Sequence, residues 1–301
     1  MPAPTPDRGR TLTGVALMLG AMALLPFLDV VAKHLGQRGM PVMQAVWARM
    51  AFGTLLTLPF VLGIGGARAL VPDRPFYHLF RAGFLIAATF CFFWSLKYLP
   101  IAGALAIFFV QPLIVTALSP LVLGEHVGPR RWAAVAAGLL CTVIIRPGFQ
   151  TVSAGMLLAL GAGLSLALYM LMTRRISGQS HAMVTTFHTS LLGAGIATLA
   201  VWPVWQAPEP VEWGHFLLLG MIATGGHFLI VRAYDHCEAS LLAPLAYTEM
   251  VMATVAGWWF FGDFPDGWTF VGVGILIASA VYISVRERKL GATPPRDFEQ
   301  P

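Results

Sequence analysis

Long apolar runs follow one another along almost the whole chain, and they limit its fold more than any other feature. A helix needs about 20 mostly apolar residues to cross the hydrocarbon core of a bilayer. Turn residues such as Gly39-Met40-Pro41 and Arg146-Pro147-Gly148 separate the runs. We predict ten membrane-spanning helices, near residues 12–34, 42–64, 76–97, 100–122, 131–146, 154–173, 183–205, 213–234, 239–261 and 268–285.

The scarcity of charge supports the same conclusion. Charged residues make up 11% of the chain and hydrophobic residues 57%, whereas soluble domains carry roughly 25% charged residues. The net charge of +5 does not indicate nucleic-acid binding, because the basic residues stand singly between apolar runs. The three cysteines show no zinc-binding spacing. We therefore expect lipid and a small-molecule solute as partners, and no nucleic acid, metal or cofactor.

The distribution of Lys and Arg predicts the orientation of the chain. If the N-terminus is cytoplasmic, fourteen of these residues fall on the inner side and four on the outer side, with Arg49 inside the second span. Basic residues concentrate on the cytoplasmic side of membrane proteins. We therefore predict that both termini are cytoplasmic.

The two halves of the chain resemble each other. A shift of 141 residues places Gly14 and Gly20 on Gly155 and Gly161, and a shift of 138 places Gly124-Glu125 on Gly262-Asp263. Each half holds five predicted spans, an odd number, so the second half would be inverted in the membrane. We predict an all-α polytopic membrane protein with five-helix repeats at residues 1–150 and 151–290 and a cytoplasmic tail at 291–301. Inverted repeats are typical of secondary transporters.

The end of each half carries a resemblance to a known family. Residues 97–147 contain PIAGALAIFFVQPLIVTALSPLVLGEHVG, and residues 233–283 contain ASLLAPLAYTEMVMATVAGWWFFGDF. These segments resemble the EamA-type carriers of the drug/metabolite transporter superfamily, although Gly262-Asp263 departs from the family's Gly-Glu. The chain looks most like bacterial amino-acid and metabolite exporters, including the aromatic amino-acid exporter group. The resemblance implies a ten-helix carrier in the bacterial inner membrane.

These features predict a secondary transporter that exports amino acids, possibly aromatic, or related metabolites by alternating access. One alternative is a metabolite importer, such as an S-adenosylmethionine or nucleotide-type carrier, and another is a membrane receptor or assembly factor. We do not expect an enzyme. Tyr234-Asp235 and Gly262-Asp263 resemble elements of membrane aspartyl proteases, but the predicted topology places the two aspartates at opposite membrane faces. Substrate, direction and oligomeric state stay open at this point.

Ionisable residues within spans are costly and therefore indicate a site. Glu249 and Gln111 fall at equivalent positions of the two repeats, so Glu249 is expected to bind a substrate ammonium or carry a proton. The alternative is a neutral carboxyl hydrogen-bonded to a neighbour. Arg49 is the candidate partner of a substrate carboxylate; otherwise it pairs with Asp29 or Glu249 or extends to the interface.

Other residues are candidates for the wall of the substrate cavity. His188 and His227 could line it or serve only in packing. The aromatic rings of Trp94, Tyr98 and Tyr247 could hold a flat substrate or lie in an interfacial belt.

Gating residues are predicted from spacing and from proline. Asp29 and Lys33 are four residues apart, which suits either a structural pair or an outer gate. Pro26, Pro112 and Pro244 are expected to break helices inside spans.

Overall fold

The computed structural model of the chain describes residues 8–123, 153–175, 181–234, 236, 242, 245, 248–264, 267, 270, 271 and 274. In this part every regular element is helical. The first half contains α1 (Arg8–Gln37), α2 (Val42–Gly65), η1 (Gly66–Leu70), α3 (Pro75–Ser95), α4 (Ile101–Phe108) and α5 (Gln111–Leu123). The second contains α7 (Ala154–Arg175), α8 (Ala182–Val201), η2 (Trp202–Val204), α9 (Pro210–Tyr234) and α11 (Thr248–Phe261).

Six of the described helices are long and apolar enough to cross a membrane, namely α1, α2, α3, α7, α8 and α9. They coincide with six of the predicted spans. The predicted spans at 131–146 and 268–285 lie outside the described residues, apart from 270, 271 and 274, and only the second part of the span at 239–261 is described as a continuous helix.

The predicted span at 100–122 is two helices rather than one. α4 ends at Phe108 and α5 begins at Gln111, so Pro112 occupies the first turn of α5, where its missing N–H breaks no intrahelical bond. α7 lies very close to this break. A Cβ atom on Gly163 would lie 3.0 Å from the carbonyl oxygen of Phe108, so a residue without a side chain is needed there.

We predicted that Pro26 interrupts its helix, and this prediction is wrong. Pro26 is buried inside α1, which continues through it from Arg8 to Gln37. Proline removes only one backbone donor from a helix, and the packing of α1 against α9 and α11 supports the flanking turns.

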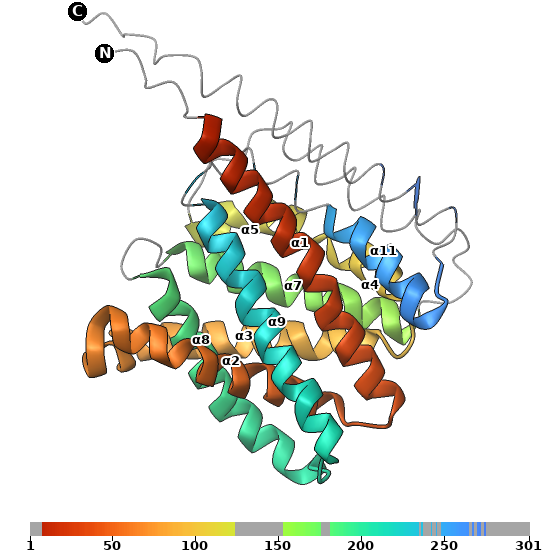
Figure 1. Cartoon of the computed structure of the whole chain (residues 1–301), viewed down its shortest axis with the longest axis horizontal. Helices are drawn as coiled ribbons and strands as arrows, with labels where there is room; N and C mark the ends of the chain where they lie inside the picture. Colours follow the sequence, from red (N-terminus) through yellow and green to blue (C-terminus); the bar gives the residue numbers. More distant parts are fainter. Residues whose placement is uncertain are drawn as a thin grey trace, which may run out of the picture.

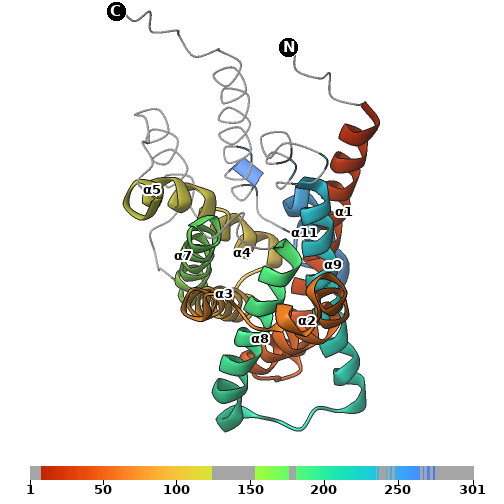
Figure 2. The same ribbon diagram turned by 90° about the vertical axis from the view of Figure 1, so that its left-hand side faces the viewer.

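The helices of one half pack mainly against the helices of the other. α1 lies along α9 and α3 lies along α7 (Figure 1), while α2 packs against α8 (Figure 2). The contact of α1 with α11 corresponds to that of α7 with α4 and α5. Among the described helices, the pattern of contacts is preserved when the two halves are exchanged. The interior of the molecule is therefore the surface between the halves.

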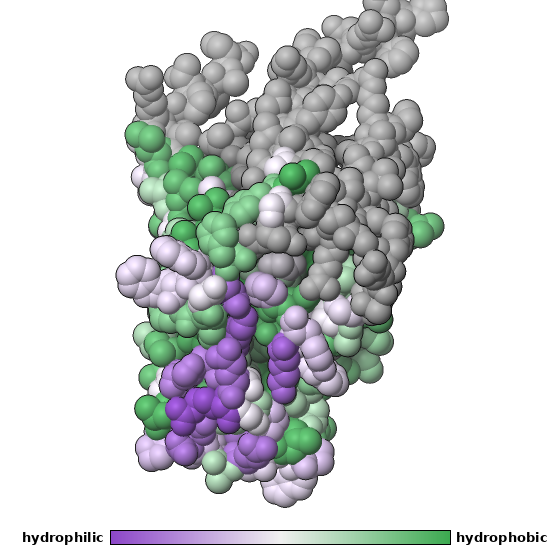
Figure 3. Space-filling model, turned by 90° about the vertical axis from the view of Figure 1, so that its right-hand side faces the viewer, coloured by the Kyte–Doolittle hydropathy of each residue, from purple (hydrophilic) through white to green (hydrophobic). Residues whose placement is uncertain are grey.

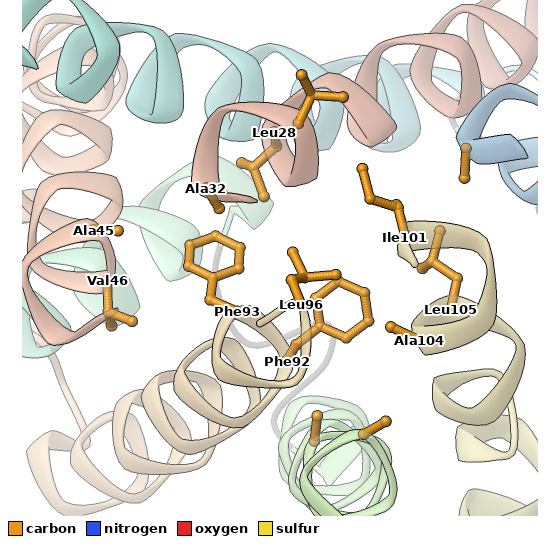
Figure 4. Close-up of a cluster of buried hydrophobic side chains, with 14 of the residues drawn as sticks. Leu28, Ala32, Ala45, Val46, Phe92, Phe93, Leu96, Ile101, Ala104 and Leu105 are labelled. Atoms are coloured by element: carbon orange, nitrogen blue, oxygen red, sulfur yellow. The ribbon is translucent and has the colours of Figure 1, made fainter. Parts of the chain in front are cut away.

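An apolar core fills part of this interior. Side chains from α1, α2, α4 and the end of α3 converge in it (Figure 4), including Leu28, Val46, Phe92 and Ile101. The outward faces are also apolar, and Trp259 is 76% exposed. Large exposed apolar surfaces are unusual for a soluble monomer, whereas lipid covers them in a membrane.

Candidate functional site

A polar group lies deep between the two halves, around Arg49 of α2. Its Nη1 donates a hydrogen bond to Oγ1 of Thr89 on α3 at 2.7 Å. The Thr89 hydroxyl in turn donates to the Leu85 carbonyl oxygen at 2.8 Å, so its lone pairs face the guanidinium. Arg49 keeps part of its surface accessible although it lies far inside the bundle. The cation is thus held in place and remains reachable.

Three further helices bring ionisable groups toward Arg49, and a fourth brings an acid toward Asp29. Asp29 of α1 and Tyr169 of α7 interact with it electrostatically, as does His227 of α9. Glu249 of α11 interacts with Asp29. We call these residues the Arg49 site: Asp29, Arg49, Thr89, Tyr169, His227 and Glu249.

The charges of the Arg49 site are near one another but not joined. Among the described residues, no ion pair within 4.0 Å connects Arg49 to Asp29 or Glu249. Asp29 is 5% exposed, while Arg49, His227 and Glu249 are partly accessible. A separated cation and acid of this kind can each bind one end of a ligand that carries both charges.

Gln111 lies elsewhere. Its Nε2 contacts Sδ of Met170 on α7 at 2.7 Å, whereas Glu249 interacts electrostatically with Asp29. The prediction that Gln111 and Glu249 face a common substrate site therefore stays a prediction. Tyr247 and Pro244 lie outside the described residues.

A pocket of about 480 Å³ opens where α1, α3 and α11 end. Its lining includes Lys33, Lys97, Tyr98, Phe261 and Asp263, and hydrophilic residues gather on this face of the molecule (Figure 3). Tyr98 is 53% exposed there. Trp94 is not in the lining; it packs against Phe90 with ring centroids 5.1 Å apart. The pocket is distinct from the Arg49 site.

The expected pairing of Lys33 with Asp29 is also wrong. Lys33 forms its ion pair with Asp263, just beyond α11, and not with Asp29. Its Nζ also lies 4.8 Å from the ring centroid of Phe261. Asp29 and Lys33 share one helix with suitable spacing, but Asp29 is directed into the interior while Lys33 meets the other half. Together with Arg38, which pairs with Glu209 and Glu212, this pair forms what we call the ion-pair end.

The two candidate histidines lie in different places. His227 belongs to the Arg49 site, whereas Nε2 of His188 lies 2.9 Å from the Ala69 carbonyl oxygen and its ring packs on His78. His188 therefore belongs to a second buried group, which includes Arg81. Arg81 is 1% exposed and was not among the candidate site residues predicted from the sequence; its position about two turns inside α3 was the available signal.

A comparison with protein families identifies the chain. The model of the EamA-like transporter family matches residues 12–146 and 153–285. The chain belongs to the EamA-like transporter family. As expected from the sequence, it is therefore a membrane transporter of small molecules in the drug/metabolite transporter superfamily.

The relatives carry different substrates in different directions. The chain is 25% identical to an S-adenosylmethionine uptake transporter of Rickettsia prowazekii (strain Madrid E), over 92% of this chain and 94% of that one. It is 27% identical to a riboflavin transporter of Vibrio cholerae, over 92% and 95%. It is also 27% identical to the pseudopaline exporter CntI of Pseudomonas aeruginosa, over 92% and 97%.

A solved crystal structure shares the fold. It superposes with a TM-score of 0.66 and 20% identity, covering 94% of this chain and 98% of the other. The arrangement of helices described above is therefore one that occurs in a known structure.

Proposed function

We propose that this EamA-like transporter is a secondary carrier that exports amino acids or related metabolites across the bacterial inner membrane, with both termini in the cytoplasm. The observation that carries the proposal is the Arg49 site, where one cation and two acids from different helices lie together without forming an ion pair. A zwitterionic solute would supply the missing partner of each.

Charge is costly in the interior of this protein. An ionised side chain away from water is unfavourable unless another charge or hydrogen bonds compensate it. In our proposal the substrate carboxylate binds Arg49 and its ammonium lies toward Asp29 and Glu249. Tyr169 and His227 complete the wall of the site, and both come from the second predicted repeat.

Alternating access would follow from the position of the site between the repeats. In this mechanism the pocket at the ion-pair end leads to the outer side, and the Lys33–Asp263 pair acts as the outer gate. Tyr98 would receive the solute in the pocket. Gln111, Tyr247 and Trp94 are proposed to contact larger substrates, and Pro112 and Pro244 to mark breaks in the moving helices.

Uptake is the second candidate, and it is favoured by the S-adenosylmethionine uptake transporters among the relatives. S-adenosylmethionine carries an amino-acid group, which would bind at the Arg49 site, and an aromatic base. The same site would then serve a carrier that works in the opposite direction.

Flux into proteoliposomes tests the proposal. Radiolabelled phenylalanine, methionine and S-adenosylmethionine are offered to the wild type, Arg49→Gln and the control Arg68→Gln, whose side chain is exposed on η1. A charge-assisted hydrogen bond contributes about 1.5–3 kcal/mol, so we expect Arg49→Gln to lower the rate about 10- to 150-fold. No flux of any of the three solutes, or equal rates in both variants, would contradict the proposed substrate site.

Proton coupling is a separate part of the proposal and depends on Glu249. The flux is measured with and without a pH gradient for the wild type and Glu249→Gln. If Glu249 carries the proton, the gradient changes the rate of the wild type and leaves the variant unaffected. Equal rates in all four measurements would exclude coupling through Glu249.

A further inference from the structure

Arg81 has the largest fully buried side chain in the described part of the chain, and the proposed function does not use it. It is 1% exposed and lies on α3. Its Nε donates to Oγ1 of Thr173 at 3.0 Å, its Nη2 donates to the hydroxyl of Tyr169 at 3.4 Å, and its Nη1 lies 3.4 Å from Nδ1 of His78. With His188, whose ring packs on His78, these residues form what we call the Arg81 cluster.

The partners of Arg81 do not carry negative charge. They are two hydroxyls and one imidazole, and the Tyr169 ring centroid lies 5.2 Å from the guanidinium carbon. Within the described ranges, every ion pair belongs to Lys33 or Arg38 at the ion-pair end. Asp73 is exposed and acts electrostatically on the two histidines. Among the residues that the structure describes, Arg81 therefore has no bound counter-charge, which is an unfavourable state for a buried cation unless an anion joins it at some stage.

The cluster lies on the surface between the halves. Arg81 and His78 come from α3, Tyr169 and Thr173 from α7, and His188 from α8. Nε2 of His188 meets the Ala69 carbonyl oxygen of η1 at 2.9 Å. The contacts of Arg81 with Thr173 and Tyr169, and that of His188 with Ala69, join the first half to the second. Separation of α3 from α7 would therefore leave the guanidinium without its hydroxyl acceptors.

Tyr169 connects the cluster to the Arg49 site. Its hydroxyl accepts from Arg81, and its phenol interacts electrostatically with Arg49. Both arginines therefore interact with the same aromatic residue.

We propose that Arg81 forms a second binding site, for the carboxylate or phosphate group of an oxyanion, when α3 and α7 separate. The planar guanidinium suits such groups because it offers parallel N–H donors. In the structure, where α3 and α7 are in contact, the hydroxyl oxygens of Thr173 and Tyr169 accept the hydrogen bonds that the oxygens of the anion would accept after separation. The anion can come from a soluble molecule or from a lipid headgroup.

The test measures anion binding without the Arg49 site. The full chain carrying Arg49→Gln is placed in nanodiscs of phosphatidylcholine, and its Tm is followed against sodium benzoate and sodium phosphate, with sodium chloride at equal ionic strength as reference. Binding to the folded state should raise the Tm by about 3 °C for each tenfold increase in anion concentration above Kd. Adding Arg81→Met should abolish this rise, whereas adding Arg68→Met should retain it.

Either of two results would overturn the proposal: no rise with Arg49→Gln alone, or a rise that persists with Arg81→Met. Since a double variant can fail to fold, Arg81→Lys is titrated in the wild-type background. It keeps the charge but loses the paired donors, so the Kd for phosphate should increase at least about tenfold; an unchanged Kd contradicts the site.

Two further measurements separate the alternatives. Without added anion, Arg81→Met should have a higher Tm than the wild type, because it removes an uncompensated buried charge; a purely structural arginine would give a lower Tm, against the proposal. With phosphatidylglycerol in the nanodiscs, a Tm that is already raised and insensitive to phosphate identifies a lipid headgroup as the ligand. Flux measurements are independent of these results, so the carrier proposal and this one can fail separately.

Discussion

The ion-pair end and the Arg81 cluster join the same two halves by different chemistry. At the ion-pair end, Lys33 pairs with Asp263, and Arg38 lies 2.8 Å from Glu209 and 3.6 Å from Glu212. Each cation there has a carboxylate. In the Arg81 cluster the cation is more deeply buried, yet it meets only hydroxyls and an imidazole.

The difference shows that two kinds of interaction hold the same two halves together: compensated ion pairs at one place and a buried cation among hydroxyls and imidazole at the other. The ion-pair end is complete within the chain, and neutral hydrogen bonds between Gln44 and Gln206 add to it at 2.7 and 3.1 Å. The Arg81 cluster leaves a charge uncompensated. The stability of the ion-pair end should therefore depend on its own residues and on the salt concentration. The stability of the Arg81 cluster should instead respond to an added anion.

The strongest test of this comparison disturbs the contact between α2 and α9, one helix from each of the two halves that both ends join. A Cβ atom on Gly220 of α9 would lie 2.4 Å from Cβ of Phe52 on α2, so Gly220→Ala must separate the helices. We expect it to lower the free energy of unfolding by about 1–3 kcal/mol and to weaken both ends alike. Unfolding in mixed micelles with increasing dodecyl sulfate measures it.

Gly214→Ala is the matched control for Gly220→Ala. Gly214 lies on the same helix and has open space around the added methyl group. Alanine there should raise the stability by about 0.5–1 kcal/mol. Equal effects of the two variants would mean that the close approach of α2 and α9 is not required.

The next prediction concerns the strength of the ion-pair end. A double-mutant cycle with Lys33→Met and Asp263→Asn should give a coupling energy of about 1–2 kcal/mol, because the Lys33 side chain is largely buried and its bond is charge-assisted. Unfolding of the four proteins gives the value. Additive effects would show that Lys33 and Asp263 do not stabilise this end together.

A smaller effect is expected in the Arg81 cluster. Thr173→Val removes the acceptor of the Nε donor of Arg81, which should lower the free energy of unfolding by about 1 kcal/mol. Thr13→Val provides the control, since the exposed Thr13 hydroxyl bonds only within its own helix, to the Gly9 carbonyl oxygen. If Thr13→Val is the more harmful change, Thr173 does not support Arg81.

The smallest expected effect is on the ion-pair end, and its dependence on salt distinguishes this end from the Arg81 cluster. Arg38→Gln should lower stability by about 0.2–1 kcal/mol at low salt, because Arg38 and Glu209 are exposed. In 1 M sodium chloride the Debye length falls to about 3 Å, and the difference between variant and wild type should vanish. The effect of Thr173→Val should persist at both salt concentrations; loss of both effects in salt would remove the distinction.

The predictions made from the sequence were wrong where contacts depend on distant parts of the chain. Its spacing rule identified Asp29 and Lys33 as neighbours on one helix, but the second half supplied Asp263 as the partner of Lys33. Proline chemistry suggested a break at Pro26, but α9 and α11 pack along a continuous α1. Arg81 was not predicted as a site residue, because a position near the end of a span does not reveal whether α7 covers it.

By itself the sequence determined that this protein is helical, crosses membranes and belongs among small-molecule carriers. Helicity and membrane insertion depend on the length and polarity of local segments, which the lipid imposes on each helix separately. The prediction of a carrier rested on the similarity of the two halves and on the family resemblance. Only the tertiary structure decided which charges face each other. It brought Asp29, Arg49 and Glu249 into one site and left Arg81 among neutral groups, because the energy of a buried charge depends on neighbours that come from remote parts of the chain.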